Sequence, residues 1–139
     1  MNGILLVDTG ALLCLLAESS EHHAWAARSM REFSGPAVTT EPVLTETAHL
    51  LRRFGKPAHA ILKALRSGMV EVGFSIQAEH GKVLALMERY NDLPMSLADA
   101  SLVRLSELHR ECTIFTLDSD FQIYRRHGNK TIPLLMPEG

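Results

Sequence analysis

This chain has few of the residues that cross-link a protein or embed it in a membrane. Its two cysteines, Cys14 and Cys112, lie beside apolar residues and show no C-x-x-C spacing, which argues against a disulfide framework or a cysteine metal site. No run of about 18 uncharged apolar residues could span a bilayer. Asp8 interrupts the apolar N-terminal stretch, and no basic segment precedes it as in a signal peptide. We expect reduced, buried thiols and a cytoplasmic protein that makes no membrane contact.

The chain also lacks a strong net charge. The formal charge is −2 and the isoelectric point is near 6.4, so the composition gives no global basic field for nucleic acid and leaves only a local basic patch. With 139 residues, 46% of them hydrophobic and 22% charged, the chain has the size and composition of one globular domain. No linker or repeat divides it, and we expect a single domain over residues 1–139.

Short apolar runs alternate with helical patterns along the chain. The expected strands are 4–7, 37–39, 69–73, 113–117 and 131–136. The expected helices are 9–17, 22–33, 41–54, 58–66, 75–90, 96–110 and a short one within 118–126. Two helices show an inward-facing stripe, formed by Ile76, Val83, Leu84 and Met87 and by Ala98, Leu102, Leu105 and Leu108. The alternation predicts an α/β fold with a parallel sheet covered on both faces.

Acidic residues follow two of the expected strands. Asp8 ends the run from Ile4, and Asp118 and Asp120 follow the strand that ends at Leu117. Ligands of open α/β sheets bind outside the carboxyl ends of the strands, so acids at these positions are candidates for a site. A second interpretation is structural: Asp8 would cap the next helix, and Asp118 and Asp120 would form a cap or an Asx turn.

Two further acids share a helical face with apolar residues. Glu46 has Val43 and Leu50 as neighbours one turn away, and Asp99 has Leu102. A buried carboxylate without a partner costs several kcal/mol or takes up a proton. A salt bridge for Glu46, or the favourable end of a helix dipole for Asp99, would explain each acid separately. Taken together, the acids indicate a carboxylate cluster of the kind that binds Mg²⁺ or Mn²⁺ and supports displacement at phosphorus.

Four stretches carry a resemblance to a known family. They are Leu6-Val7-Asp8-Thr9, Leu44-Thr45-Glu46-Thr47-Ala48, the long segment from Asp92 to Val103, and Thr116-Leu117-Asp118-Ser119-Asp120-Phe121. In this order and at these intervals, the chain resembles a PIN domain, specifically the VapC-type toxin ribonucleases of bacterial toxin–antitoxin pairs. The resemblance covers the whole chain.

The resemblance implies a Rossmann-like, three-layer α/β/α sandwich with a mostly parallel central sheet of about five strands. It implies a ribonuclease that uses Mg²⁺ or Mn²⁺, forms a homodimer and is inhibited by a cognate antitoxin that covers the site. By position, Asp8, Glu46 and Asp99 match the three strongest family acids. Asp118 matches the fourth, and Asp120 matches a less regular fifth.

These positions translate into expected roles. Asp8 and Asp99 would bind the metal, Asp118 or Asp120 would complete its shell, and Glu46 would act through water. Substrate RNA is expected to contact Thr9 beside the first acid and a set of bases that follow Glu46 and Asp120. The bases are Arg52, Arg53, Lys56, Arg125, Arg126 and Lys130, for which a solvated surface is the alternative interpretation. The open alternative for the whole protein is an inactive PIN-like module that only binds RNA or protein.

Overall fold

The computed structural model describes residues 3–138, and a five-stranded parallel sheet forms its centre. The strand order is β3-β2-β1-β4-β7, and every neighbouring pair is parallel. The strands are β1 (Ile4–Val7), β2 (Ala37–Thr39), β3 (Glu71–Val72), β4 (Cys112–Phe115) and β7 (Leu134–Leu135). The α/β fold with about five parallel strands is therefore confirmed.

The central strand β1 is apolar because both of its faces are covered. Leu5, Leu6 and Val7 have no solvent exposure, and β1 pairs with β2 on one side and with β4 on the other. Strands buried on both faces have continuous runs of branched apolar residues rather than an alternating pattern. The run that ends at Asp8 thus marks the middle of the core.

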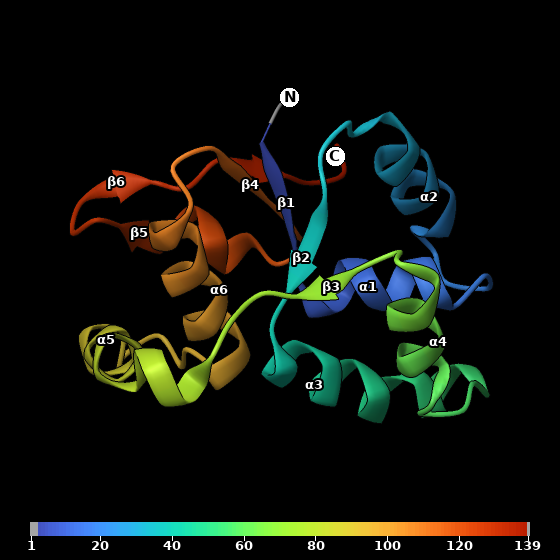
Figure 1. Cartoon of the computed structure of the whole chain (residues 1–139), viewed down its shortest axis with the longest axis horizontal. Helices are drawn as coiled ribbons and strands as arrows, with labels where there is room; N and C mark the ends of the chain where they lie inside the picture. The colour runs from blue at the N-terminus through green and yellow to red at the C-terminus, as the bar shows by residue number, and fades with distance from the viewer. Residues whose placement is uncertain (1–2, 139) are drawn as a thin grey trace.

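Helices lie on both sides of this sheet. In Figure 1, α5 and α6 lie to the left of β1 and β2, while α1, α2 and α4 lie to the right and α3 runs below them. The helices are α1 (Thr9–Leu16), α2 (His23–Glu32), α3 (Glu41–Leu51), α4 (Ala60–Ser67), α5 (Ile76–Arg89) and α6 (Leu97–Leu108). This arrangement is the expected three-layer sandwich.

The strand order reverses direction beside β1. From β1 the chain moves outward to β2 and β3, and α5 and α6 then return it to β4 on the other side of β1. The ends of β1 and β4 meet there, with the Asp8 N–H donating to the Phe115 carbonyl at 3.0 Å. Such a switch point leaves a crevice outside the strand ends, where ligands of α/β proteins bind.

Side-chain caps define where three helices begin. The hydroxyl oxygens of Thr40, Ser75 and Ser96 accept hydrogen bonds from backbone N–H groups in the first turns of α3, α5 and α6. Pro42 stands in the first turn of α3, where its missing N–H has no cost. These caps fix the starts of the two helices that carry Glu46 and Asp99.

The segment after β4 differs from the prediction of a short helix over 118–126. Only η2 (Ser119–Gln122), a 3-10 helix, forms there, and β5 (Arg125–Arg126) then pairs antiparallel with β6 (Lys130–Thr131). His127 and Gly128 turn the hairpin with φ angles of 52° and 88°. Two successive residues of positive φ are typical of the tight turns that match the twist of a hairpin.

Several boundaries and two inward-facing residues were also predicted wrongly. The helix expected to reach Phe54 becomes a 3-10 turn, η1 (Arg52–Phe54), after Leu51, and the outer strands are shorter than expected. Leu84 and Leu108 are 58% and 44% exposed, so they do not belong to the inward-facing stripes. The buried cysteines, by contrast, are free as expected.

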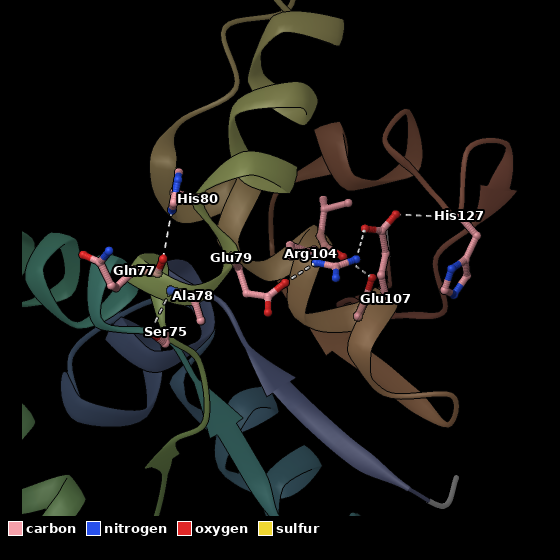
Figure 2. Close-up of polar contacts among 10 residues, drawn as sticks. Ser75, Gln77, Ala78, Glu79, His80, Arg104, Glu107 and His127 are labelled. Atoms are coloured by element: carbon pink, nitrogen blue, oxygen red, sulfur yellow. Dashed lines mark hydrogen bonds and ion pairs between the residues drawn. The ribbon is translucent and has the colours of Figure 1, made fainter.

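A polar network fastens the β5–β6 hairpin to the helices (Figure 2). Arg104 on α6 donates to Glu79 on α5 at 2.7 Å and to Glu107 on α6 at 3.1 Å. Glu107 also accepts the backbone N–H of His127 at 2.8 Å. One partly buried guanidinium therefore ties α5 to α6, and Glu107 ties α6 to the hairpin turn.

Among residues 3–138, no helix combines the length and apolarity needed to cross a membrane.

Candidate active site

Asp8 lies at the end of β1 and is only 4% exposed. It occupies the N-cap position of α1, but its side chain makes no capping hydrogen bond. Its Oδ2 instead accepts the Thr116 hydroxyl at 2.6 Å. The capping interpretation is therefore wrong, and the carboxylate faces the neighbouring strand end.

Thr116 connects two of the predicted acids. Besides donating to Asp8, its hydroxyl oxygen accepts the backbone N–H of Asp118 at 2.9 Å. Asp118 Oδ1 in turn accepts the backbone N–H of Asp120 at 2.9 Å, which begins η2. The interpretation of Asp118 as a cap is thus confirmed, because its Oδ1 atom caps η2. Sequence reasoning assigned no role to Thr116, although a hydroxyl at the end of an apolar strand and two residues before an acid was a usable signal.

Asp99 is half-buried in the first turn of α6 and contacts an unexpected partner. The Tyr124 hydroxyl donates to Asp99 Oδ2 at 3.1 Å. The two residues are 25 positions apart and come from different elements, so no sequence spacing pointed to this contact.

The carboxylates influence one another electrostatically. Burial, and then the charges of Asp99 and Asp118, raise the pKa of Asp8 to about 7, although hydrogen bonds from Thr116 and the Thr9 backbone oppose this. Burial, with a smaller contribution from Asp118, also raises the pKa of Asp99. Asp120 is absent from the main influences on either acid and acts instead on Tyr124. Of the two acids after β4, Asp118 therefore has the stronger electrostatic influence on Asp8 and Asp99.

Among residues 3–138, no cationic side chain forms an ion pair with any of the four acids. In the described part of the chain, the ion pairs join Lys56 to Glu18 and Arg104 to Glu79 and Glu107, and none includes Asp8, Asp99, Asp118 or Asp120. Like charges that share a low-dielectric site favour protonation or the binding of a cation.

Glu46 does not lie on a buried face as its helical neighbours suggested. Its side chain is exposed on α3, because the inward face of this helix is formed by Val43, Leu44, Thr47 and Leu51. Glu46 instead lines a groove of about 690 Å³ together with Glu41, Pro42, Thr45, His49, Ile76, Leu97 and Ala98. Leu97 and Ala98 bring the first turn of α6 to this groove, but Asp8, Asp99, Asp118 and Asp120 are not among its lining residues.

The bases that follow Glu46 lie beyond the C-terminal end of α3. Thr40, which precedes α3, contacts Ser101 on α6, with 2.8 Å between the two hydroxyl oxygens. Arg52 and Arg53 are exposed in η1 at the opposite end of α3, roughly 18 Å or more from Thr40 by helical rise. Lys56 pairs with Glu18 at 2.6 Å.

The bases after Asp120 mostly contact the protein itself. Arg125 Nη1 donates to the carbonyls of Gln122, Ile123 and Tyr124 at 2.8–3.1 Å. Arg126 Nη1 donates to the Ser106 carbonyl at 2.9 Å and to the Cys112 sulfur at 3.1 Å. Of the three bases after Asp120, all within the described residues, Lys130 alone is exposed and makes no side-chain hydrogen bond to the protein. These arginines therefore support the hairpin.

We tested whether the residues present fit a divalent cation. Within residues 3–138, no group of three or more His, Cys, Asp or Glu side chains is placed so that together they could hold a metal ion. The site nevertheless has three mutually acting carboxylates and the buried Thr9 hydroxyl, which has no hydrogen-bond partner. Mg²⁺ is usually held by one or two carboxylates and keeps several waters. The donor set therefore fits a partly hydrated Mg²⁺ or Mn²⁺.

The fold and the position of these acids define an α/β domain with an acidic site at its switch point. The chain belongs to the PIN domain family, which it matches over residues 5–126. It is 29% identical to ribonuclease VapC26 of Mycobacterium tuberculosis over 132 residues, which span 94% of this chain and 93% of the relative. The crystal structure of M. tuberculosis VapC20, described as a toxin that cleaves the sarcin–ricin loop, superposes with a TM-score of 0.72. That comparison covers 86% of this chain and 93% of VapC20 at 24% identity, and it supports the same fold.

Proposed function

We propose that this chain is a metal-dependent endoribonuclease and the toxin of a toxin–antitoxin pair. The observation that carries the proposal is the buried Asp8 carboxylate, which ends the central strand, interacts with the charges of Asp99 and Asp118 and forms no ion pair among residues 3–138. Membership of the PIN family and the likeness to a relative named as a ribonuclease support RNA as the substrate.

In this proposal Asp8 and Asp99 bind the cation directly, and Asp118 binds it directly or through water. A bound Mg²⁺ or Mn²⁺ would supply Lewis-acid activation of water and stabilise negative charge at phosphorus. Thr116 fixes the orientation of Asp8, and the buried Thr9 hydroxyl, which has no hydrogen-bond partner, would bond to a water held by the cation. Glu46, exposed at the groove, would orient the attacking water or accept its proton.

Basic side chains would contact the RNA. A phosphate backbone needs basic groups near the site. The free guanidinium edge of Arg125 and the exposed Lys130 are the nearest candidates along the chain, whereas Arg52 and Arg53 would meet only a longer RNA that follows α3. A homodimer and an antitoxin that covers the acidic groove complete the proposal.

Two measurements test the proposal. Mn²⁺ should raise the melting temperature of the wild type and leave that of Asp8→Asn nearly unchanged, because binding to the folded state alone stabilises it. Purified wild type should also cleave total RNA or a sarcin–ricin stem-loop in Mn²⁺. No thermal shift in the wild type would contradict the metal site. Binding of RNA without any cleavage would favour the inactive module.

A further inference from the structure

Tyr124 is an unusual neighbour for an acidic site. It has no solvent exposure and is the largest fully buried side chain of the described residues, yet its hydroxyl reaches Asp99 Oδ2 at 3.1 Å. A buried phenol normally finds one hydrogen-bond partner. Here that partner is a carboxylate rather than a backbone carbonyl.

Aromatic rings hold Tyr124 in place. Phe121 and Tyr90 pack against its ring edge-on, with ring centroids 5.2 Å and 5.1 Å away. The Tyr90 hydroxyl accepts the backbone N–H of Arg125 at 2.9 Å, which anchors the residue directly after Tyr124. The phenol oxygen thus has little freedom to move away from Asp99.

We propose that Tyr124 is a positioning residue that fixes the Asp99 carboxylate in the orientation in which it binds the divalent cation. The inference deepens the proposed function and rests on it. The Tyr124 hydroxyl donates to Asp99 Oδ2, which restricts rotation of the carboxylate. Because the two oxygens are rigidly linked, this hydrogen bond also fixes the direction in which Oδ1 points. Removing a hydrogen bond that orients a metal-binding side chain typically weakens metal affinity by about 10–100-fold.

The chain offers a matched control, because it has only two tyrosines and they pack against each other. Tyr124→Phe removes the hydroxyl that contacts Asp99. Tyr90→Phe removes a hydroxyl from the same aromatic cluster, but one that contacts only the Arg125 backbone. Calorimetric titration with Mn²⁺ alone, without RNA, should give about tenfold weaker binding for Tyr124→Phe and binding close to wild type for Tyr90→Phe.

The outcomes separate this inference from the proposed function. If the wild type binds Mn²⁺ and Tyr124→Phe binds it equally well, the positioning role is wrong and the metal site stands. An equal loss in both variants would indicate a general effect of the aromatic cluster and would also overturn the role. If the wild type itself binds no Mn²⁺, the proposed metal-dependent function fails, and this inference fails with it.

A second measurement uses the wild-type residues, in case Tyr124→Phe does not fold. Incorporation of 3-fluorotyrosine gives one fluorine signal for each tyrosine, and the Tyr90→Phe protein assigns the signal of Tyr124. Saturation with Mg²⁺ should shift the Tyr124 signal more than that of Tyr90. A Tyr124 signal that stays in place while Mg²⁺ binds would contradict the inference.

Discussion

The Thr116 hydroxyl donates to Asp8 Oδ2 at 2.6 Å, although 108 residues separate the two in the chain. The contact joins the ends of the two strands that meet at the switch point. The same hydroxyl accepts the Asp118 N–H, so one side chain sets the positions of two acids. The site is therefore organised by neutral hydrogen-bond donors rather than by bases, which leaves its negative charge available to a cation.

Replacing Asp8 should stabilise the metal-free protein in a pH-dependent way. The Asp8 pKa is about 7 in the folded protein against an ordinary value of 3.8, so the folded chain retains a proton that the unfolded chain has lost between these values. Wild-type stability therefore falls as pH rises through this range, and Asp8→Asn escapes the loss. We expect the stability advantage of Asp8→Asn to grow by about 2 kcal/mol from about pH 5.5 to pH 8.

Urea unfolding of both proteins in EDTA measures this difference. Subtracting the two curves cancels the titration of the shared groups that do not interact with Asp8, whereas Asp99 and Asp118 are coupled to it. An advantage that is constant with pH, or that shrinks as pH rises, would show that Asp8 is ionised at ordinary pH in the folded state.

Glu46→Gln should reduce RNA cleavage by about tenfold or more without destabilising the protein. The side chain is exposed and makes no hydrogen bond that the fold needs, so its free energy of unfolding should change by less than about 0.5 kcal/mol. Glu41→Gln is the matched control, because Glu41 is exposed and lines the same groove. Equal activity of the two variants would remove Glu46 from the mechanism.

The hydroxyl pair of Thr40 and Ser101 should couple α3 to α6. Both residues have no solvent exposure, and Thr40 also caps α3. Thr40→Val should cost about 1–2 kcal/mol of unfolding free energy. Thr47→Val, which removes a hydroxyl bonded only within α3, should cost less. A double-mutant cycle of Thr40→Val with Ser101→Ala should give a coupling of at least about 0.5 kcal/mol. Additive effects would show that the two helices are held by other contacts.

Arg126 and Arg125 should differ in their contribution to stability. Arg126 donates to carbonyls at the end of α6 and to the buried Cys112 sulfur, whereas the contacts of Arg125 are local and mostly exposed. Thermal unfolding should show a loss of about 2 kcal/mol for Arg126→Met and less than about 1 kcal/mol for Arg125→Met. The opposite order would mean that the hairpin is not held by its contact with α6.

The sequence predicted the parts of the fold that depend on local patterns. The apolar run Ile4–Val7 and the alternation of strands and helices each depend on residues close together in the chain. The hairpin of Arg125–Arg126 with Lys130–Thr131 was missed, because a two-residue strand has no recognisable period and His127 is not a typical residue for positive φ.

For the site, the acids could be predicted but their surroundings could not. Asp8, Asp99 and Asp118 stood out as carboxylates at strand ends or in a helix that also carries core residues. Glu46 was placed wrongly, because helical spacing gives neighbours but not the direction from which the rest of the protein packs. Contacts such as Tyr124 with Asp99 join separate elements and depend on how the elements pack.

The central claim is that these acids cleave RNA with a divalent cation. The most direct measurement maps the RNA ends produced by wild type and by Asp99→Asn, side by side in Mn²⁺ and in EDTA. We predict discrete new ends with the wild type in Mn²⁺ only, and a loss of at least about a hundredfold in Asp99→Asn. Identical ends from both proteins, or undiminished cleavage in EDTA, would contradict the account.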